Sequence, residues 1–316
     1  MPSINAQGLN GRSQLLGILM PRYLWPALQE ITWAIADYIT NETRYEIIFY
    51  SCSNDNGDGY TRVLDQIVST NLVAGLIATL YDQSPEHLVE LYEQGLPVVL
   101  LDTIGLQTNL PTVCADHYSG AYEGVRYLLE SGHRRIGYIQ GTAHWKCSHD
   151  RYRAYCDALA SYGLQPDPEL FQQAEYTPKS GEVAARALLT LEDRPTAIFA
   201  TNDDMASSAI MVAQELHLHV PEDISILGFN DDPVPFVRSM LTTVHQPFST
   251  MARCAAELLV SQIQTQYRFS DELQRILQMT TRPTFARELG ELPMPFSLQF
   301  PTHLVTRTTS ARRTAT

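Results

Sequence analysis

The sequence lacks a long apolar run, a cysteine framework and a signal-like N-terminus, and each absence excludes a class of protein. No apolar run reaches the roughly 18 residues that a membrane-spanning helix requires. The five cysteines are scattered without paired spacing, which is typical of reduced thiols rather than of a disulfide scaffold. Residues 1–14 are polar and show no basic segment followed by an apolar block. We therefore expect a cytoplasmic protein without a membrane anchor.

Basic charge is also scarce. Lysine and arginine number 22 against 35 aspartates and glutamates, which gives a formal net charge of −13. A chain that binds DNA by itself normally carries a basic stripe that displaces counterions from the phosphates. Only two short basic pairs are present, Arg134 with Arg135 and Arg312 with Arg313. We expect that this chain does not bind DNA well on its own.

Motifs of catalysis are missing as well. The apolar run Leu15–Met20 is not followed by a glycine-rich phosphate loop, and neither a Gly-x-Ser-x-Gly elbow nor a His-Glu-x-x-His helix occurs. No pattern fixes a nucleophile beside a base. We therefore expect neither an enzyme nor a cofactor.

Three short patterns imitate known sites and fail on inspection. A calcium-like loop lacks the final glutamate and follows an expected strand, a zinc-like group has no fourth ligand, and a glycosylation sequon has no secretory context. They are Asn54, Asn56, Asp58 and Gly59 with Asp65; His144, Cys147 and His149; and Asn41-Glu42-Thr43. We expect no metal site, a polar loop in the first place, and either a polar loop or a ligand contact in the second.

What the sequence does contain is an alternation of short apolar runs and amphipathic stretches. Unbroken apolar runs suit strands that are covered on both faces, and apolar residues at three- and four-residue spacing predict helices, as over 27–40 and 118–131. The runs cover 15–20, 46–51, 74–80, 97–102, 135–141, 196–201 and 224–229. This alternation predicts an α/β fold with doubly wound parallel sheets.

The length of 316 residues and a restart of the series near Ser119 predict two similar lobes. We expect residues 1–14 to be a linker, 15–115 plus 247–296 one lobe, and 116–246 plus 297–316 the other. In open α/β sheets the ligand lies beyond the carboxyl ends of the strands, so a site is expected in the cleft between the lobes.

Four blocks give the sequence a specific resemblance. They are Val113–Gly141, Arg194–Ala206, Val220–Pro233 and Leu241–Pro247, in this order and at natural spacing. Together they resemble the regulatory core of the lactose/galactose repressor (LacI/GalR) family, over nearly the whole chain except the excursion 267–296. The resemblance implies a type I periplasmic-binding-protein-like fold with a multi-crossing hinge, a small effector such as a sugar, and a homodimer. It also implies operator DNA binding through a helix-turn-helix that this chain does not contain.

Residues 2–13 resemble the hinge segment that joins the helix-turn-helix to the core in that family. Leu9 occupies the position of the leucine that wedges into the minor groove, with Ala6 and Gln7 in register before the first strand. An ordinary frayed terminus is the alternative.

The resemblance also implies a set of effector contacts. Arg151 takes the place of an arginine that forks onto ligand oxygens, Asn202 that of a polar contact, and Tyr176 that of a stacking ring. Asn230 and Arg22 depart from the family pattern, which usually has acidic residues there, and this indicates an altered effector. The remaining candidates are Trp25, Asp102 and Gln246; Trp25 and Tyr176 could equally be core residues.

The expected mechanism is closure of the lobes on the effector, with chain crossings near Ala115, His245 and the segment before Leu304. Closure would shift the hinge segments of a dimer and change operator affinity. A periplasmic-type sugar-binding protein of a transporter is the main alternative, and an α/β enzyme acting on a sugar or nucleoside is a second one.

Overall fold

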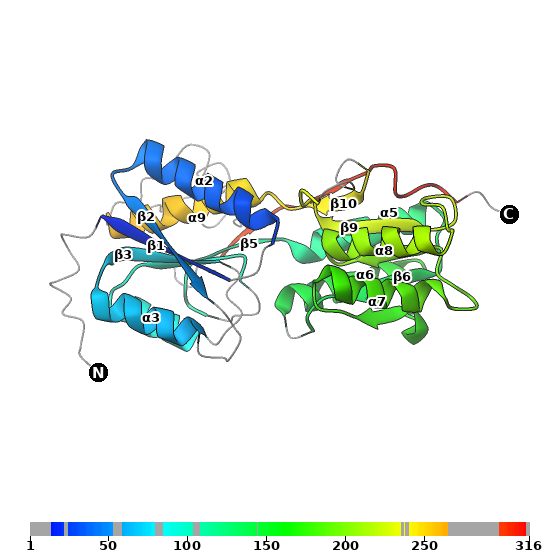
Figure 1. The fold of residues 1–316 in the computed structure, drawn as a ribbon, viewed down its shortest axis with the longest axis horizontal. Coiled ribbons are helices and arrows are strands. Elements are labelled where there is room, and N and C mark those ends of the chain that lie inside the picture. The colour runs from blue at the N-terminus through cyan, green and yellow to red at the C-terminus, as the bar shows by residue number, and fades with distance from the viewer. Residues whose placement is uncertain are drawn as a thin grey trace. The chain divides into compact units, whose positions relative to one another are not determined.

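The computed structural model describes residues 14–21, 25–52, 59–79, 85–103, 108–143, 145–234, 237, 240–264 and 297–313. The chain divides into two compact units, Met1–Ala115 with Pro247–Phe300 and Asp116–Gln246 with Pro301–Thr316. It therefore passes from one unit to the other at three points, and each unit has its own sheet and helices (Figure 1).

The first unit is built on a six-stranded sheet in the order β11-β5-β4-β3-β1-β2, with all paired neighbours parallel. Its strands are β1 (Leu15–Pro21), β2 (Glu46–Cys52), β3 (Val73–Thr79), β4 (Val98–Leu101), β5 (Thr112–Ala115) and β11 (Ser297–Phe300). Its helices are α2 (Ala27–Glu42), α3 (Gly59–Thr70), α4 (Glu86–Glu93) and α9 (Phe248–Ile263).

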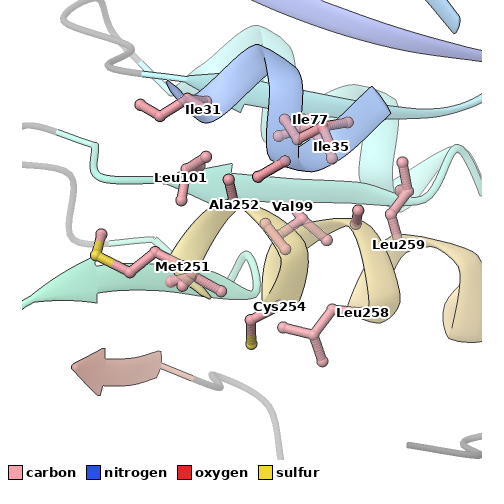
Figure 2. Packing of buried hydrophobic residues seen from close by; sticks show 14 of the residues in the cluster. Ile31, Ile35, Ile77, Val99, Leu101, Met251, Ala252, Cys254, Leu258 and Leu259 are labelled. Carbon is pink, nitrogen blue, oxygen red and sulfur yellow. The ribbon is translucent and has the colours of Figure 1, made fainter. Parts of the chain in front are cut away.

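Helices cover both faces of this sheet (Figure 1). On one face α2 and α9 pack together, and Ile31 and Ile35 of α2 meet Ile77 and Val99 of the sheet (Figure 2). On the other face, α3 and α4 contribute buried leucines such as Leu88. Each such side chain, buried completely, contributes about 1.5–3 kcal/mol to folding. The unbroken apolar runs of the sequence therefore follow from burial on both faces.

The second unit repeats the plan in the order β12-β10-β9-β8-β6-β7, in which only the edge strand β12 is antiparallel. Its strands are β6 (Ile136–Gln140), β7 (Phe171–Gln173), β8 (Ala197–Ala200), β9 (Ser225–Asn230), β10 (Thr242–His245) and β12 (His303–Val305). Its helices are α5 (His117–Glu130), α6 (Lys146–Ser161), α7 (Pro178–Leu189) and α8 (Asp203–Glu215), with a short 3-10 turn at Pro168–Leu170.

Successive residues of β6 show how this second core is divided. Tyr138 packs under α5 and α6 together with Phe199 and Phe229, whereas the next residue, Ile139, packs under α7 and α8. Neighbouring side chains of a strand point to opposite faces, so one strand supplies two cores. The expected fold class, two doubly wound parallel-sheet lobes, is confirmed.

One boundary of the expected lobes is wrong. Residues 297–300 were expected in the second lobe, but they form β11, which pairs in parallel with β5 of the first unit, Leu298 beside Val113 and Phe300 beside Ala115. Alternating burial explains the pairing, because Leu298 and Phe300 fill the core under α9 while their neighbours stay exposed. The expected helix at 271–279 and the excursion at 282–296 lie outside the described residues.

None of the helices in the described part of the chain combines the length and apolarity that crossing a bilayer demands.

Candidate functional site

The strand order of the second unit marks one edge of its sheet as a place for a ligand. From β6 the chain winds outward to β7 in one direction and to β8, β9 and β10 in the other. Loops after β6 and β8 therefore diverge at their carboxyl ends, which is the usual ligand position in open α/β sheets. The Thr201 hydroxyl joins the two loops, because it accepts from the Gly141 amide at 3.0 Å and donates to the Ile139 carbonyl at 3.0 Å.

Arg151 of α6 lies at this edge and is only 4% exposed. Its guanidinium donates to the Thr201 carbonyl and approaches Nδ1 of His117 at 3.2 Å. Its Cζ lies 3.8 Å from the ring centroid of Phe229 and 6.0 Å from that of Tyr176. The buried Nε–H has no hydrogen-bond partner, and no carboxylate of the described residues forms an ion pair with the side chain. A buried cation without an anion is costly and is normally compensated.

Tyr176 forms an aromatic wall beside Arg151. Its ring stacks on Trp145, with centroids 5.1 Å apart and planes at 24°. Its other neighbour is Gly141, where an added Cβ would lie 2.0 Å from Cζ of the tyrosine. The hydroxyl bonds with Ser148 at 2.7 Å, and burial raises the pKa of Tyr176 well above its ordinary value. The ring is thus clamped between a glycine and an indole.

Asn202 caps helix α8. Its Oδ1 accepts from the Met205 amide at 3.0 Å, and its Nδ2 donates to the Tyr176 carbonyl at 3.1 Å. The second bond holds the backbone of Tyr176, whose φ of +58° lies in the left-handed region. One N–H and one lone pair of the amide remain for other partners.

Asn230 ends β9 with a φ of +119° and is 5% exposed. Its Nδ2 donates to Asp232 at 2.7 Å, and its Oδ1 accepts from Gln246 at 2.5 Å. Gln246 is 1% exposed, and its Oε1 has no hydrogen-bond partner among the described residues. Among the described residues, the buried atoms without a hydrogen-bond partner at this edge therefore include a donor on Arg151 and an acceptor on Gln246.

A buried carboxyl underlies this edge. Asp203, the first residue of α8, accepts from the Thr243 hydroxyl at 2.6 Å and from the Asp232 amide at 2.7 Å. Burial, with repulsion from the Asp232 carboxylate, raises the pKa of Asp203 well above its ordinary value.

Asp231 carries the opposite shift. Burial works against its ionisation, but hydrogen bonds from His245 at 3.2 Å and Arg307 at 2.8 Å outweigh burial and lower its pKa. Asp231 thus links His245, at the end of β10, to Arg307, in the segment that follows β12.

Two further candidates belong to the first unit. Trp25 is half-buried at the start of α2, in edge-on contact with Phe248 at 4.9 Å between centroids. Asp102 follows β4 with a φ of +47°, and its Oδ1 accepts from the Ala115 amide at 3.5 Å. Trp25 therefore packs on the core of its unit, as the alternative interpretation of it expected. Whether either residue contacts an effector stays a prediction.

The remaining candidates fall elsewhere. Arg22 and the hinge residues Leu9, Ala6 and Gln7 lie outside the described residues. In the zinc-like group, Sγ of Cys147 lies 3.6 Å from the Tyr176 hydroxyl oxygen. His144 lies outside the described residues. Among the described residues, no group of three or more histidine, cysteine or carboxylate side chains could hold a metal ion.

Sequence comparison decides the family. The family model for a periplasmic binding protein-like domain matches residues 125–285. The HTH-type transcriptional repressor CytR of Escherichia coli (strain K12) is 31% identical over 256 residues, which cover 81% of this chain and 74% of the relative. Catabolite control protein A of Priestia megaterium is 32% identical over 261 residues, covering 82% and 78%. The chain belongs to the LacI/GalR family of transcription regulators.

Solved structures agree on the fold. A complex of the transcriptional regulator CelR with cellobiose matches with a TM-score of 0.78 and 24% identity, covering 95% of this chain and 85% of that one. A lac repressor dimer bound to operator and the anti-inducer ONPF matches with a TM-score of 0.77 and 20% identity, covering 96% of each chain. Kinship with repressors favours a regulator over the transporter component that the sequence left open.

For this LacI/GalR-family chain, the structure brings five predicted contacts onto one unit: Arg151, Tyr176, Asn202, Asn230 and Gln246. Sequence reasoning missed three neighbours. Trp145 and Gly141 follow β6, and their position after the carboxyl end of a strand could have identified them as site residues. The sequence around His117 contains no signal that predicts its contact with Arg151.

Proposed function

We propose that the chain is the effector-sensing core of a transcription regulator, and that a small polar effector, such as a sugar, binds at the carboxyl edge of the second unit. The observation that carries this proposal is Arg151, a buried cation that has no carboxylate partner among the described residues and an unused Nε–H. An effector oxygen would accept that hydrogen. The unused Gln246 Oε1 would accept from an effector hydroxyl or amine.

The aromatic wall supports the same ligand class. Trp145 and Tyr176 present stacked π-faces, which are common walls for sugar rings and for flat heterocycles. The two buried polar groups would orient the effector, and the aromatic wall would add apolar contact area. Binding without turnover is expected, since no nucleophile–base pair occurs at this edge within the described residues.

The test is a thermal-shift screen against neutral sugars, sugar phosphates and nucleosides, with matched variants. Arg151→Lys keeps a cation but loses the planar fork, and Arg153→Lys makes the same change two residues further on at an exposed site. A ligand at about a hundred times its dissociation constant stabilises the folded form by roughly 2.7 kcal/mol. We expect this shift in the wild type and Arg153→Lys, and its loss in Arg151→Lys.

Two results would contradict the proposal. An equal shift in Arg151→Lys would place the ligand elsewhere in the chain. No shift with any compound would leave a regulator that responds to a protein partner instead of a small molecule.

A homodimer is the second part of the proposal. Large apolar side chains are exposed on the outer helices of each unit: Trp33 of α2 is 72% exposed, Val183 of α7 67% and Met211 of α8 58%. A second copy of the chain would remove them from water, with a gain of about 25 cal/mol per Å². Light scattering tests this. We expect a dimer in the wild type and a monomer in Met211→Glu, while Val68→Glu, a half-buried position on α3, should leave the dimer intact.

Effector binding would alter operator affinity through a DNA-reading domain that these residues do not include. We expect the regulator to act in the cytoplasm. The expected closure of the lobes on the effector stays a prediction.

A further inference from the structure

Three polar side chains form a hydrogen-bonded series at the carboxyl ends of β9 and β10, which we call the amide relay: Asp232, Asn230 and Gln246. The two strands pair in parallel with His245 beside Asn230, and the Gln246 backbone amide donates to the Asn230 carbonyl at 3.2 Å. Nδ2 of Asn230 donates to Oδ2 of Asp232 at 2.7 Å, and Nε2 of Gln246 donates to Oδ1 of Asn230 at 2.5 Å. Strand pairing therefore holds the two side-chain amides against each other.

The carboxylate at one end fixes the direction of the whole relay. A carboxylate offers only acceptors, whereas a side-chain amide has a donor end and an acceptor end. Asn230 must therefore turn its NH2 group to Asp232 and its oxygen to Gln246. Gln246 must then turn its NH2 group to Asn230, which leaves Oε1 on the other side, where it has no hydrogen-bond partner among the described residues. Turning either amide around would bring two acceptors together.

The electrostatics of the neighbouring carboxyl agree with a charged Asp232. Its backbone amide donates to the Asp203 carboxyl at 2.7 Å. Burial, with repulsion from the Asp232 carboxylate, raises the pKa of Asp203. A proton taken up by Asp203 relieves that repulsion and leaves Asp232 as the carboxylate that orients the relay.

The backbone beneath the relay is held in an unusual conformation. Asn230 and Asp231 have φ values of +119° and +63°, both in the left-handed region. Residues other than glycine keep such values only where their surroundings hold them. Here the Asn230 carbonyl accepts from Gln246 and the Asp232 amide donates to Asp203, so the segment is fixed at both ends.

We propose that Asp232 is a positioning residue that determines effector specificity: by fixing the direction of the amide relay, it makes Gln246 present an acceptor, so that the effector must bring an N–H or O–H group to it. This inference rests on the proposed function of the carboxyl edge. Asn230, which the sequence predicted as an effector contact, acts in it by orienting Gln246. An effector analogue without that donor leaves the buried oxygen unpaired, which lowers its affinity about ten- to a hundredfold.

Moving the acid from one end of the relay to the other tests its direction without an effector. Gln246→Glu should lower the urea midpoint of unfolding, because the amide of Asn230 can turn its NH2 group to only one of two carboxylates. Adding Asp232→Asn allows the relay to reverse, since the new asparagine can donate to Asn230, whose Nδ2 then donates to the new glutamate. At about pH 8, where glutamate is ionised, this double variant should recover most of the loss.

Asp231→Asn is the matched control, because it also removes one carboxylate beside the relay. Asp231 bonds with His245 and Arg307 instead of Asn230, so its loss does not allow the relay to reverse. Each double variant is compared with its own single variant at position 231 or 232, which isolates the coupling to Gln246→Glu. We expect strong coupling with Asp232→Asn and little with Asp231→Asn.

Equal coupling in both pairs would reduce the effect to charge repulsion, and a Gln246→Glu chain as stable as the wild type would mean that the relay has no fixed direction. Either result would overturn the inference. If Gln246→Glu does not fold, circular dichroism of the double variant with Asp232→Asn decides: a folded chain supports the relay and an unfolded one contradicts it.

The effect on specificity is tested by thermal shift with probes that differ by one donor: glucose with its singly fluorinated deoxy analogues, and adenosine with purine riboside, which lacks the amine. The wild type should bind one parent about tenfold or more tighter than an analogue. Asp232→Asn should narrow this gap, since the NH2 group of Gln246 can then face the effector. An unchanged gap would overturn the role of Asp232 in specificity. Binding of none of these probes would count against the proposed function and leave the relay as the stability measurements find it.

Discussion

At position 141 the chain has no room for a side chain. A Cβ there would lie 2.0 Å from the ring of Tyr176, far inside van der Waals contact. Gly141→Ala must therefore push the ring away from Trp145 or strain the loop after β6, at a cost of about 1–3 kcal/mol. Urea denaturation measures the loss of stability.

A double-mutant cycle separates the two causes. Tyr176→Leu removes the ring, so Gly141→Ala should cost much less in that background. An equal cost in both backgrounds would show that the alanine disturbs the backbone alone.

Asp203 is the residue whose ionisation has the clearest effect on how folding stability depends on pH. Burial and the neighbouring Asp232 raise its folded pKa above the ordinary value of 3.8. A carboxyl with a raised folded pKa contributes stability at low pH that is lost as the pH rises through the folded value. Asp203→Asn cannot ionise, and its amide can still accept from the Asp232 amide and donate to Thr243.

The expected result is a stability curve that falls less in Asp203→Asn than in the wild type as the pH rises above the ordinary carboxyl value of 3.8. Denaturant melts across this range measure it. Asp65→Asn, on the exposed face of α3, is the matched control and should follow the wild type. A wild-type curve that rises steadily with pH, with Asp203→Asn below it throughout, would contradict the assignment.

In helix α8 a single side chain, Asn202, both caps the helix and belongs to the candidate site. Asn202→Ala removes the cap of α8 and the tether on the Tyr176 carbonyl, and should cost about 1 kcal/mol or somewhat more. Asn202→Asp keeps the capping oxygen and should regain most of the stability, but it loses the Nδ2 donor to Tyr176. Guanidinium denaturation measures both variants.

The comparison cap is Thr177 of α7, which accepts from the Ser180 amide at 3.2 Å. Thr177→Ala should cost a similar amount of stability and leave effector binding intact, whereas both Asn202 variants should weaken binding. Equal binding by all three variants would assign Asn202 to the helix cap alone.

The strands also show how much of the fold can be predicted from the sequence. The long apolar runs became strands because both sheet faces are covered, which a single sequence displays directly. The short strands β5, β7, β10 and β11 were not among the predicted runs, since three or four residues give too little pattern. β11 in particular depends on pairing with β5, 182 residues or more away in sequence (297 against 115), and no local feature encodes a partner at that distance.

The candidate site likewise contains residues that the sequence predicted and contacts that it did not. Arg151, Tyr176 and Asn202 were predicted by resemblance, because whole blocks of sequence matched a family in order. The contact of His117 with Arg151 was not, since it joins the start of α5 to the second turn of α6. Gln246 was predicted as a contact, but its unused oxygen follows only from the orientation that Asn230 imposes on its amide.

On the scale of the whole molecule, net charge determines whether the chain can bind DNA. The net charge is −13, and the basic pair at the start of β6 is already engaged. Arg135 pairs with Asp167 at 3.1 Å and with Asp193 at 3.0 Å, while Arg134 donates to two backbone carbonyls and lies over the ring of Tyr162. This pair is therefore not free to displace counterions from phosphates.

The chain alone should therefore show no salt-dependent affinity for duplex DNA, with a dissociation constant weaker than about 100 µM at physiological ionic strength. Fluorescence anisotropy with a labelled duplex measures this, and lowering the salt reveals any weak contact. Fusion of a family helix-turn-helix ahead of residue 1 should restore binding whose logarithm falls linearly with that of the salt concentration. A steep salt dependence in the unfused chain would instead mean that its own surface reads DNA, and the division of labour between an acidic sensor and a separate DNA-reading domain would be wrong.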